Sequence, residues 1–161
     1  MARKTAYSGA TLTVKLTESL TIDGRDYGGS SSSTFASIKN VTRRIETITT
    51  AEATIITFDT VVGPGQYVPA NVAYMRFTNL DDTNFITLTL KNAGNDECAI
   101  KLDAGQSFIL AGDNSGGMAA MMNATENADA ASSANLADMK DIQADADTAS
   151  CDMEIYVAAT A

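Results

Sequence analysis

A strict alternation of apolar and polar residues near the start of the chain constrains the fold most strongly. Apolar residues occupy every second position apart from Glu18, and Thr or Lys fills most positions between them: Leu12, Val14, Leu16, Leu20 and Ile22. Successive side chains of a β-strand point to opposite faces of a sheet, so this period of two predicts a strand with one apolar face. Asp23-Gly24 follows at once and favours the positive φ angles of a tight hairpin turn.

Similar segments follow along the chain, and turn residues separate them. We expect strands over residues 41–49, 53–59, 72–80, 85–90, 98–102, 106–111 and 151–158. We expect hairpins around the turns at 81–84 and 103–105, and an exposed loop over the Gly/Ser stretch 28–33. Residues 142–145 fit either a helical turn or a strand paired with the last one. Nine or ten short strands indicate a single all-β domain over 1–161, a β-sandwich of jelly-roll type with residues 1–10 as an N-terminal arm.

The composition changes in the last third of the chain. Residues 112–137 are rich in Ala, Met and Asn and are expected to form a long loop that contains at most a short helix. Met118, Met121 and Met122 form a flexible apolar group there, and Met surfaces adapt readily to partners. Two interpretations remain open, because this group either contacts a partner or folds back as a lid on the core.

Composition and charge exclude several classes of function. The chain has no His, which removes most metal sites and every Ser-His or Cys-His nucleophile. Its net charge of −9 argues against a nucleic-acid partner. No apolar run approaches the roughly 20 residues of a membrane span, so we expect no membrane partner. Cys98 and Cys151 fit no zinc spacing and are expected to be small buried hydrophobes.

Charge is also distributed unevenly along the chain. Residues 1–50 hold seven basic and four acidic residues (+3), and the remainder holds four basic and sixteen acidic residues (−12). This asymmetry indicates either a solvated surface or a basic edge that meets the acidic edge of a neighbouring subunit. Arg43 and Arg44 have the same two interpretations, a solvated face or a salt bridge between subunits.

The acidic residues do not form a recognisable catalytic or metal-binding pattern. Asp81-Asp82 is expected to cap backbone N–H groups in its turn rather than to bind calcium. No phosphate-binding loop and no defined pair of catalytic carboxylates is present. We therefore predict a protein that is not an enzyme and that has no cofactor.

Three stretches resemble small virion proteins of tailed phages that infect marine and cyanobacterial hosts. The opening Leu12–Gly28 resembles the start of these proteins, and Tyr74–Phe85 resembles their central hairpin. Residues 144–149 together with 152–157 resemble their C-terminal strand pair. The resemblance implies a non-enzymatic, oligomeric β-sandwich component of a phage particle, located in the virion and assembled in the host cytoplasm.

The sequence thus leads to one main hypothesis of function and two alternatives. The main hypothesis is a capsid decoration or cement protein that stabilises the shell as a homotrimer, with itself and the major capsid protein or other virion proteins as partners. Its expected interface residues are Met118, Met121, Met122, Arg43 and Arg44. The alternatives are a tail, neck or fibre-base component of the virion and a glycan-binding β-sandwich module.

Overall fold

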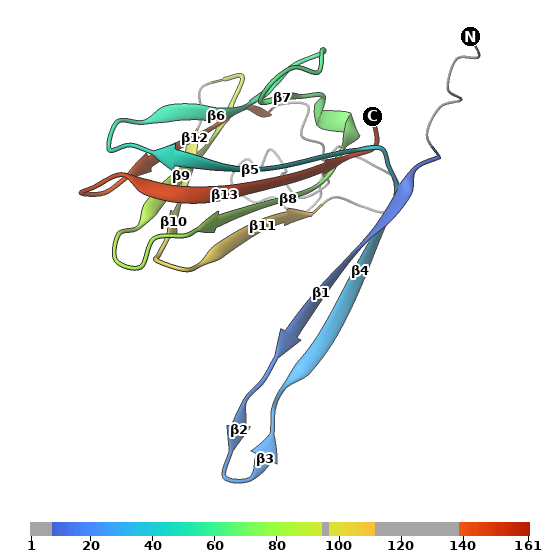
Figure 1. Ribbon diagram of the computed structural model, residues 1–161, viewed down its shortest axis with the longest axis vertical. Coiled ribbons are helices and arrows are strands. Elements are labelled where there is room, and N and C mark those ends of the chain that lie inside the picture. The colour runs from blue at the N-terminus through green and yellow to red at the C-terminus, as the bar shows by residue number, and fades with distance from the viewer. Residues whose placement is uncertain (1–7, 95–96, 112–138) are drawn as a thin grey trace.

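Two β-sheets pack face to face in the computed structural model of the chain, which describes residues 8–94, 97–111 and 139–161 (Figure 1). The first, here the β6 sheet, contains in spatial order β10 (Glu97–Leu102), β9 (Ile86–Asn92), β12 (Met139–Ala146), β6 (Ala53–Phe58) and β7 (Gln66–Tyr67). The second, here the β5 sheet, contains β11 (Ser107–Ala111), β8 (Val72–Asn79), β13 (Cys151–Ala159) and β5 (Asn40–Ile48). All these neighbours are antiparallel except β6 and β7, and a 3₁₀ turn, η1 (Pro69–Asn71), precedes β8.

The chain passes repeatedly from one sheet to the other. The connections β5 to β6, β8 to β9, β10 to β11 and β12 to β13 each cross between the two sheets. This gives the orders β5-β13-β8-β11 and β6-β12-β9-β10, which is the double-sheet arrangement of a jelly roll. The predicted all-β sandwich is therefore confirmed.

The predicted local pairing of strands was wrong in three places. β8 and β9 flank the turn at 81–84, and β10 and β11 flank the turn at 103–105, but neither pair forms a hairpin. Residues 142–145 belong to a strand, β12, which pairs with β6 and β9 and not with β13. In each case a short turn leads into the opposite sheet, and local sequence does not determine which strand becomes the neighbour.

The core between the two sheets consists of the side chains that point inward from the strands of each sheet. Phe77, Met75 and Ile155 of the β5 sheet are fully buried against Leu88 and Ile142 of the β6 sheet. Side chains on the two inner faces interdigitate in this way in sandwiches, and their burial is the main stabilising term.

The prediction for the two cysteines is correct for one of them. Cys151 is buried at the start of β13, whereas Cys98 is exposed. Cys98 lies near the beginning of β10, which is an edge strand beside β9 in the described part of the chain.

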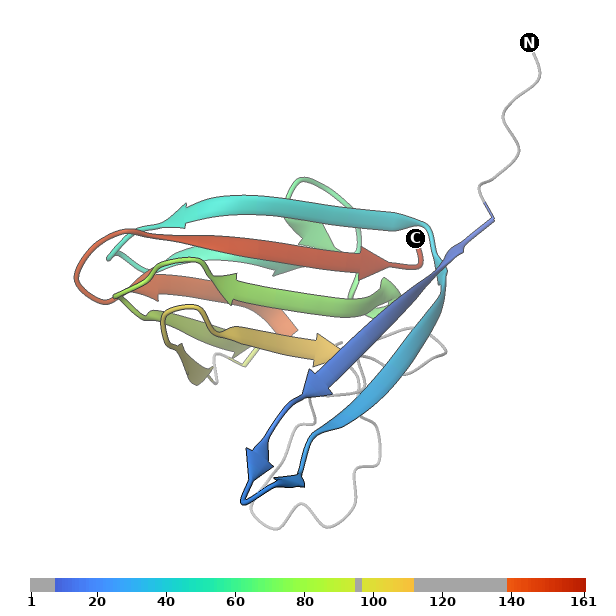
Figure 2. The same cartoon turned by 60° about the horizontal axis from the view of Figure 1, so that its bottom comes forward.

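A long hairpin projects from one end of the sandwich (Figures 1 and 2). It consists of β1 (Ala10–Glu18) paired with β4 (Gly29–Ile38), and its tip holds the short strands β2 (Thr21–Ile22) and β3 (Arg25–Asp26). We call Ala10–Ile38 the projecting hairpin. Asp23 and Gly24 have φ angles of 50° and 75°, as the predicted tight turn requires.

Two expectations about this segment were wrong. The Gly/Ser stretch 28–33, expected to be a loop, forms the first half of β4. Backbone pairing with β1 holds it in a strand although its small side chains have no apolar face to bury. The alternating residues Leu16, Leu20 and Ile22 do not line the core, and each remains about half exposed on the projecting hairpin. The first residues of the expected N-terminal arm and the expected loop at 112–137 lie outside the described residues.

Two isoleucines of the β5 sheet test this assignment of faces. Ile155 is fully buried, whereas Ile45 on the adjacent strand is 63% exposed. Ile155→Ala should lower the free energy of unfolding by about 2–5 kcal/mol, because it leaves a cavity in the core. Ile45→Ala should change it by less than about 0.5 kcal/mol in the same urea titration, run at a protein concentration too low for self-association. Similar losses for both variants would contradict the packing of the two sheets.

Candidate interaction surface

The base of the projecting hairpin is anchored by its own apolar cluster, separate from the main core. Phe35 and Ile38 of β4 are buried against Ala73, Tyr74 and Ala158 on the outer face of the β5 sheet. The rings of Phe35 and Tyr74 lie 5.8 Å apart between centroids, and those of Tyr74 and Tyr156 lie 5.9 Å apart edge to face. Such pairs stabilise beyond the area that they bury.

The hairpin strand β1 contributes to the same cluster. Leu12 and Val14 pack against it and are partly buried. Leu12 lies opposite Phe35, and Val14 lies opposite Ser33, so these residues share the face of the ribbon that meets the sandwich. Burial raises the pKa of the Tyr74 phenol at the centre of the cluster, so this group stays neutral over the physiological range.

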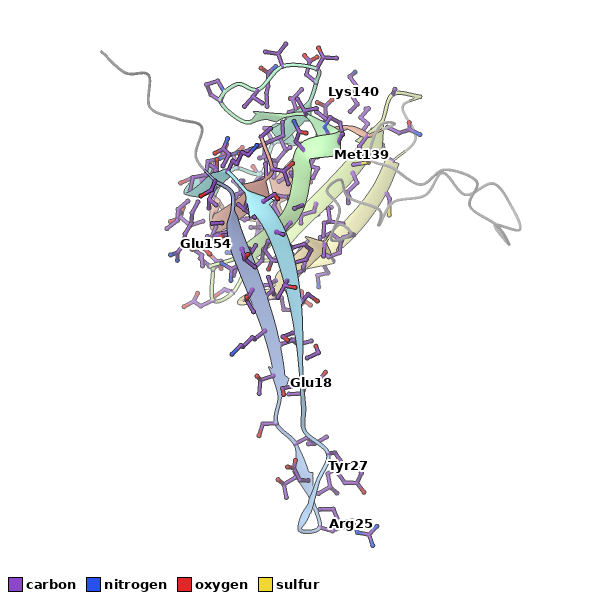
Figure 3. All side chains as sticks on the ribbon, turned by 90° about the vertical axis from the view of Figure 1, so that its right-hand side faces the viewer. Glu18, Arg25, Tyr27, Met139, Lys140 and Glu154 are labelled. Atoms are coloured by element: carbon purple, nitrogen blue, oxygen red, sulfur yellow. The ribbon has the colours of Figure 1, made fainter. Side chains whose placement is uncertain are left out.

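Beyond the cluster, the apolar residues of the hairpin do not pack on any other part of the chain among residues 8–94, 97–111 and 139–161. Leu16, Leu20, Ile22 and Tyr27 are between 51% and 59% exposed. Leu16 lies on the same face as Leu12 and Val14, opposite the small Ser31. Figure 3 shows Tyr27 and Arg25 near the tip, well beyond the sandwich.

The outer face of the β5 sheet carries an ion network next to the hairpin base. Glu154 of β13 accepts hydrogen bonds from Arg43 Nε at 2.7 Å and from the Arg76 guanidinium, so it bridges β5 and β8. The Glu154 side chain is 9% exposed, and Arg76 also lies 5.9 Å from the centre of the Tyr156 ring. Two arginines on one carboxylate satisfy a charge that would be costly to bury alone.

Exposed apolar residues flank this network on β5. Val41 and Ile45 are 52% and 63% exposed, and in the alternation of the strand they share the outer face with Arg43. Ile109 of β11 is exposed at the opposite edge of the same sheet. The outer face therefore has an ion network at its centre, with the Glu154 carboxylate paired to two arginines, and apolar residues on both edges.

The predicted interface residues Arg43 and Arg44 lie on opposite faces of β5. Arg43 points outward into the ion network. Arg44 points to the other side, where its Nη2 donates to the Ile55 carbonyl at 2.6 Å and its Nε bonds Glu46 at 3.1 Å. Alternation in a strand requires this separation of adjacent residues. Met118, Met121 and Met122 lie outside the described residues.

Arg44 and Glu46 line an open groove between β5 and the β6–β7 connection. Its volume is about 500 Å³, and the Val62–Gly65 turn and Tyr67 form its other wall. Both charged residues in the groove are already paired with each other, and Arg44 also binds a backbone carbonyl. The groove thus presents satisfied polar groups, not a set of convergent free ligands.

The acidic turns lie at the opposite end of the sandwich from the projecting hairpin. Asp81 Oδ1 accepts the backbone N–H groups of Thr83 and Asn84 at 2.8 and 2.7 Å, as its sequence position predicts. These bonds, that of Asn84 first, lower the pKa of the Asp81 carboxyl. Among residues 8–94, 97–111 and 139–161, no group of three or more His, Cys, Asp or Glu side chains could hold a metal ion.

Sequence reasoning did not select Glu154, Arg76 or the distal hairpin residues as functional. Glu154 occupies an outward position in a C-terminal strand with a clear alternation, but no local signal shows that two arginines from distant segments converge on it. A scan against models of known protein families finds no match, and a search of curated proteins finds no significant match. In the parts of the chain that the structure describes, no helix is long and apolar enough to cross a membrane.

Removing the charge of Glu154 should weaken the sandwich. Glu154→Gln keeps the size of the side chain but leaves Arg43 and Arg76 without an anion, and we expect a loss of about 1–2 kcal/mol in the free energy of unfolding. The expected loss is small for a buried charge because Arg43 is largely exposed, and solvent screens its interaction with Glu154.

Asp152→Asn on the same strand is the matched control. Asp152 is exposed and accepts a hydrogen bond from Thr47 Oγ1 at 2.8 Å, so its replacement should cost less than about 0.5 kcal/mol. Urea titrations of both variants measure the difference, and equal losses would argue that the network does not stabilise the outer face.

The acidic end should make stability depend on pH in a defined direction. Partial burial, and then the nearby Glu52, raise the pKa of Asp145 above its ordinary 3.8. The folded state therefore holds this proton more tightly than the unfolded state, and ionisation of Asp145 destabilises the fold above its folded pKa. Asp145→Asn should raise Tm at pH 7, and the gain should disappear below about pH 3.8, where both states are protonated. A gain of equal size at both pH values would show that charge is not its cause.

Proposed function

We propose that the chain is a non-enzymatic structural protein of a phage virion, which decorates the capsid shell and stabilises it. The observation that carries this proposal is the projecting hairpin, whose distal half presents four large apolar side chains away from its own sandwich. Assembly is the function that such a feature supports best, because an apolar surface held out from a folded body marks a site of protein contact.

The marginal stability of the distal hairpin favours a binding partner. A two-stranded ribbon is marginally stable in water by itself, and within the residues that the structure describes it is anchored to the sandwich at its base alone. Ordering the distal half therefore costs conformational entropy that its own contacts do not offset. A subunit that docks this half on a neighbour recovers that cost through burial.

The small free energy that one docked hairpin contributes favours assemblies with many copies. Leu16, Leu20, Ile22 and Tyr27 are about half exposed, and burying the remainder contributes roughly 1 kcal/mol each, or about 4 kcal/mol for one hairpin. That value only reaches the lower bound of the cost of association, about 4 kcal/mol. One hairpin alone thus binds weakly, and repeated contacts on a shell convert weak contacts into a stable coat.

The fold and the resemblance support the proposal in a more general way. Double-sheet jelly rolls occur in viral capsid proteins and also in lectins, so the fold by itself does not decide between assembly and glycan binding. A sugar site needs exposed aromatic faces, and among the described tyrosines Tyr67 and Tyr74 are buried while Tyr27 is exposed. The exposed residues of the hairpin are mainly aliphatic, which favours protein contact.

The number of copies per particle tests the proposal. Virions of the phage that encodes this chain are purified, and its abundance is measured by quantitative mass spectrometry against the major capsid protein. A decoration protein should be present in hundreds of copies, and shells that lack it should release their DNA at a lower temperature. Six or twelve copies would place it at the tail or neck, and absence from the particle would overturn the virion assignment.

A further inference from the structure

We propose that the distal half of the projecting hairpin binds a second copy of this chain, on the outer face of that copy's β5 sheet at Val41 and Ile45. Subunits would then join head to tail, each giving one hairpin and receiving another. The inference deepens the proposed function by naming the partner, and it rests on that function for the premise that subunits lie side by side.

The proximal half of the hairpin already shows which surface suits this ribbon. Leu12, Val14 and Phe35 pack on the outer face of the β5 sheet of their own chain, beside Tyr74 and Tyr156. Leu16 continues the same ribbon face but extends past the sheet. An equivalent sheet face on a neighbour would let the same ribbon face remain buried along its full length.

The direction of the hairpin decides which part of the neighbour it meets. The hairpin starts beside β5, crosses one end of the β5 sheet and leaves beyond β11 (Figures 1 and 2). It also slants, so that its tip lies level with the middle of the strands and not with their ends (Figure 1). A second copy placed next to β11, and turned relative to the first by the rotation that a ring requires, presents its own β5 to that tip.

The receiving surface on β5 matches the tip in both polarity and charge. Val41 and Ile45 are the exposed apolar residues of this strand, and Arg43 lies between them with 68% of its side chain exposed. The distal hairpin carries three exposed carboxylates, Glu18, Asp23 and Asp26. Apolar residues would therefore meet apolar residues, and the exposed guanidinium would meet acidic groups.

The location of charge on the rest of the chain also favours this contact. The acidic turns at the far end of the sandwich, which include Asp81, Asp82 and Asp147, would repel the same turns of another copy. The projecting hairpin holds two basic and three acidic residues, so its charge is only −1 in a chain of −9. Two copies can approach through it at little electrostatic cost.

The area of the contact indicates a closed ring and not an isolated pair. The distal ribbon has eight residues per strand, Lys15–Ile22 and Arg25–Ser32, so at about 3.3 Å per residue and about 10 Å width one face covers about 260 Å². Counting both partners, one docked hairpin buries about 530 Å², below the 1,200 Å² or so of a standard stable interface. Ring closure about doubles the area buried per subunit, and closed rings are the common outcome of head-to-tail contacts.

Substitutions on the two surfaces test the pairing. Leu16→Asp on the hairpin and Ile45→Asp on the receiving face should each raise the concentration for half-assembly by at least about tenfold, the effect of losing one buried apolar side chain. Thr17→Asp, on the other face of the same ribbon strand, and Val61→Asp, an exposed apolar residue away from the proposed contact, are the matched controls. Analytical ultracentrifugation gives the mass, and circular dichroism confirms that each variant is folded.

A cross-link between two separate chains tests the partner directly. Ile22→Cys and Ile45→Cys are made in different chains, each with Cys98→Ser because Cys98 is exposed. After the two proteins are mixed and oxidised, a disulfide-linked dimer should form in the mixture and in neither protein alone. A wild-type oligomer of three or more copies together with this cross-link supports the inference. A monomer, a dimer of two-fold symmetry or a mixture without the cross-link overturns it.

The outcomes for this inference and for the proposed function are separable. A chain that is monomeric alone but present in hundreds of copies on the shell would overturn the inference, because its hairpin would then dock on the shell protein. A chain that forms the cross-linked ring but is absent from virions would overturn the proposed function and leave the inference in place.

Discussion

The packing of Phe35 on Tyr74, whose ring also meets that of Tyr156, is the interaction on which the rest of the account depends. It anchors an otherwise free two-stranded ribbon to the outer face of the β5 sheet, and it determines the direction in which the ribbon leaves. Without this anchor the hairpin would be a flexible extension whose apolar residues could turn toward their own sandwich. With it, Leu16 and Ile22 extend from the sandwich and remain about half exposed in the part of the chain that the structure describes, where a docked partner would cover them.

The ion network beside the anchor also affects how a partner can dock on the outer face. Glu154 is held between Arg43 and Arg76, so the buried carboxylate is paired while the Arg43 guanidinium stays largely exposed. A partner that covers this face therefore desolvates no unpaired carboxylate, and its acidic groups can pair with the exposed guanidinium. The same residues therefore stabilise the sandwich and keep its outer surface available for docking.

Local sequence predicts the class of the fold but not its long-range contacts. The alternation from Leu12 to Ile22 correctly indicated a strand and a tight turn, because side-chain period and turn chemistry are local properties. The same alternation gave no means to distinguish a strand in the core from one on a projecting ribbon, so the exposure of Leu16 was missed. The partner of β4 could not be inferred either, since Ser-rich segments have no apolar face, and the convergence of Arg43 and Arg76 on Glu154 depends on strand order. The interface residues predicted near Met121 lie outside the described residues and stay a prediction.

Hydrogen–deuterium exchange of the hairpin amides tests the central claim most directly. Peptides that cover the distal hairpin are compared with peptides from buried β13, first in the assembled protein and then at a dilution at which it dissociates. The account predicts slow exchange in the distal hairpin of the assembly and fast exchange after dissociation, with β13 protected in both. Fast exchange in the distal hairpin of an intact assembly would contradict it, because the ribbon would then be exposed to solvent and not seated on a neighbour.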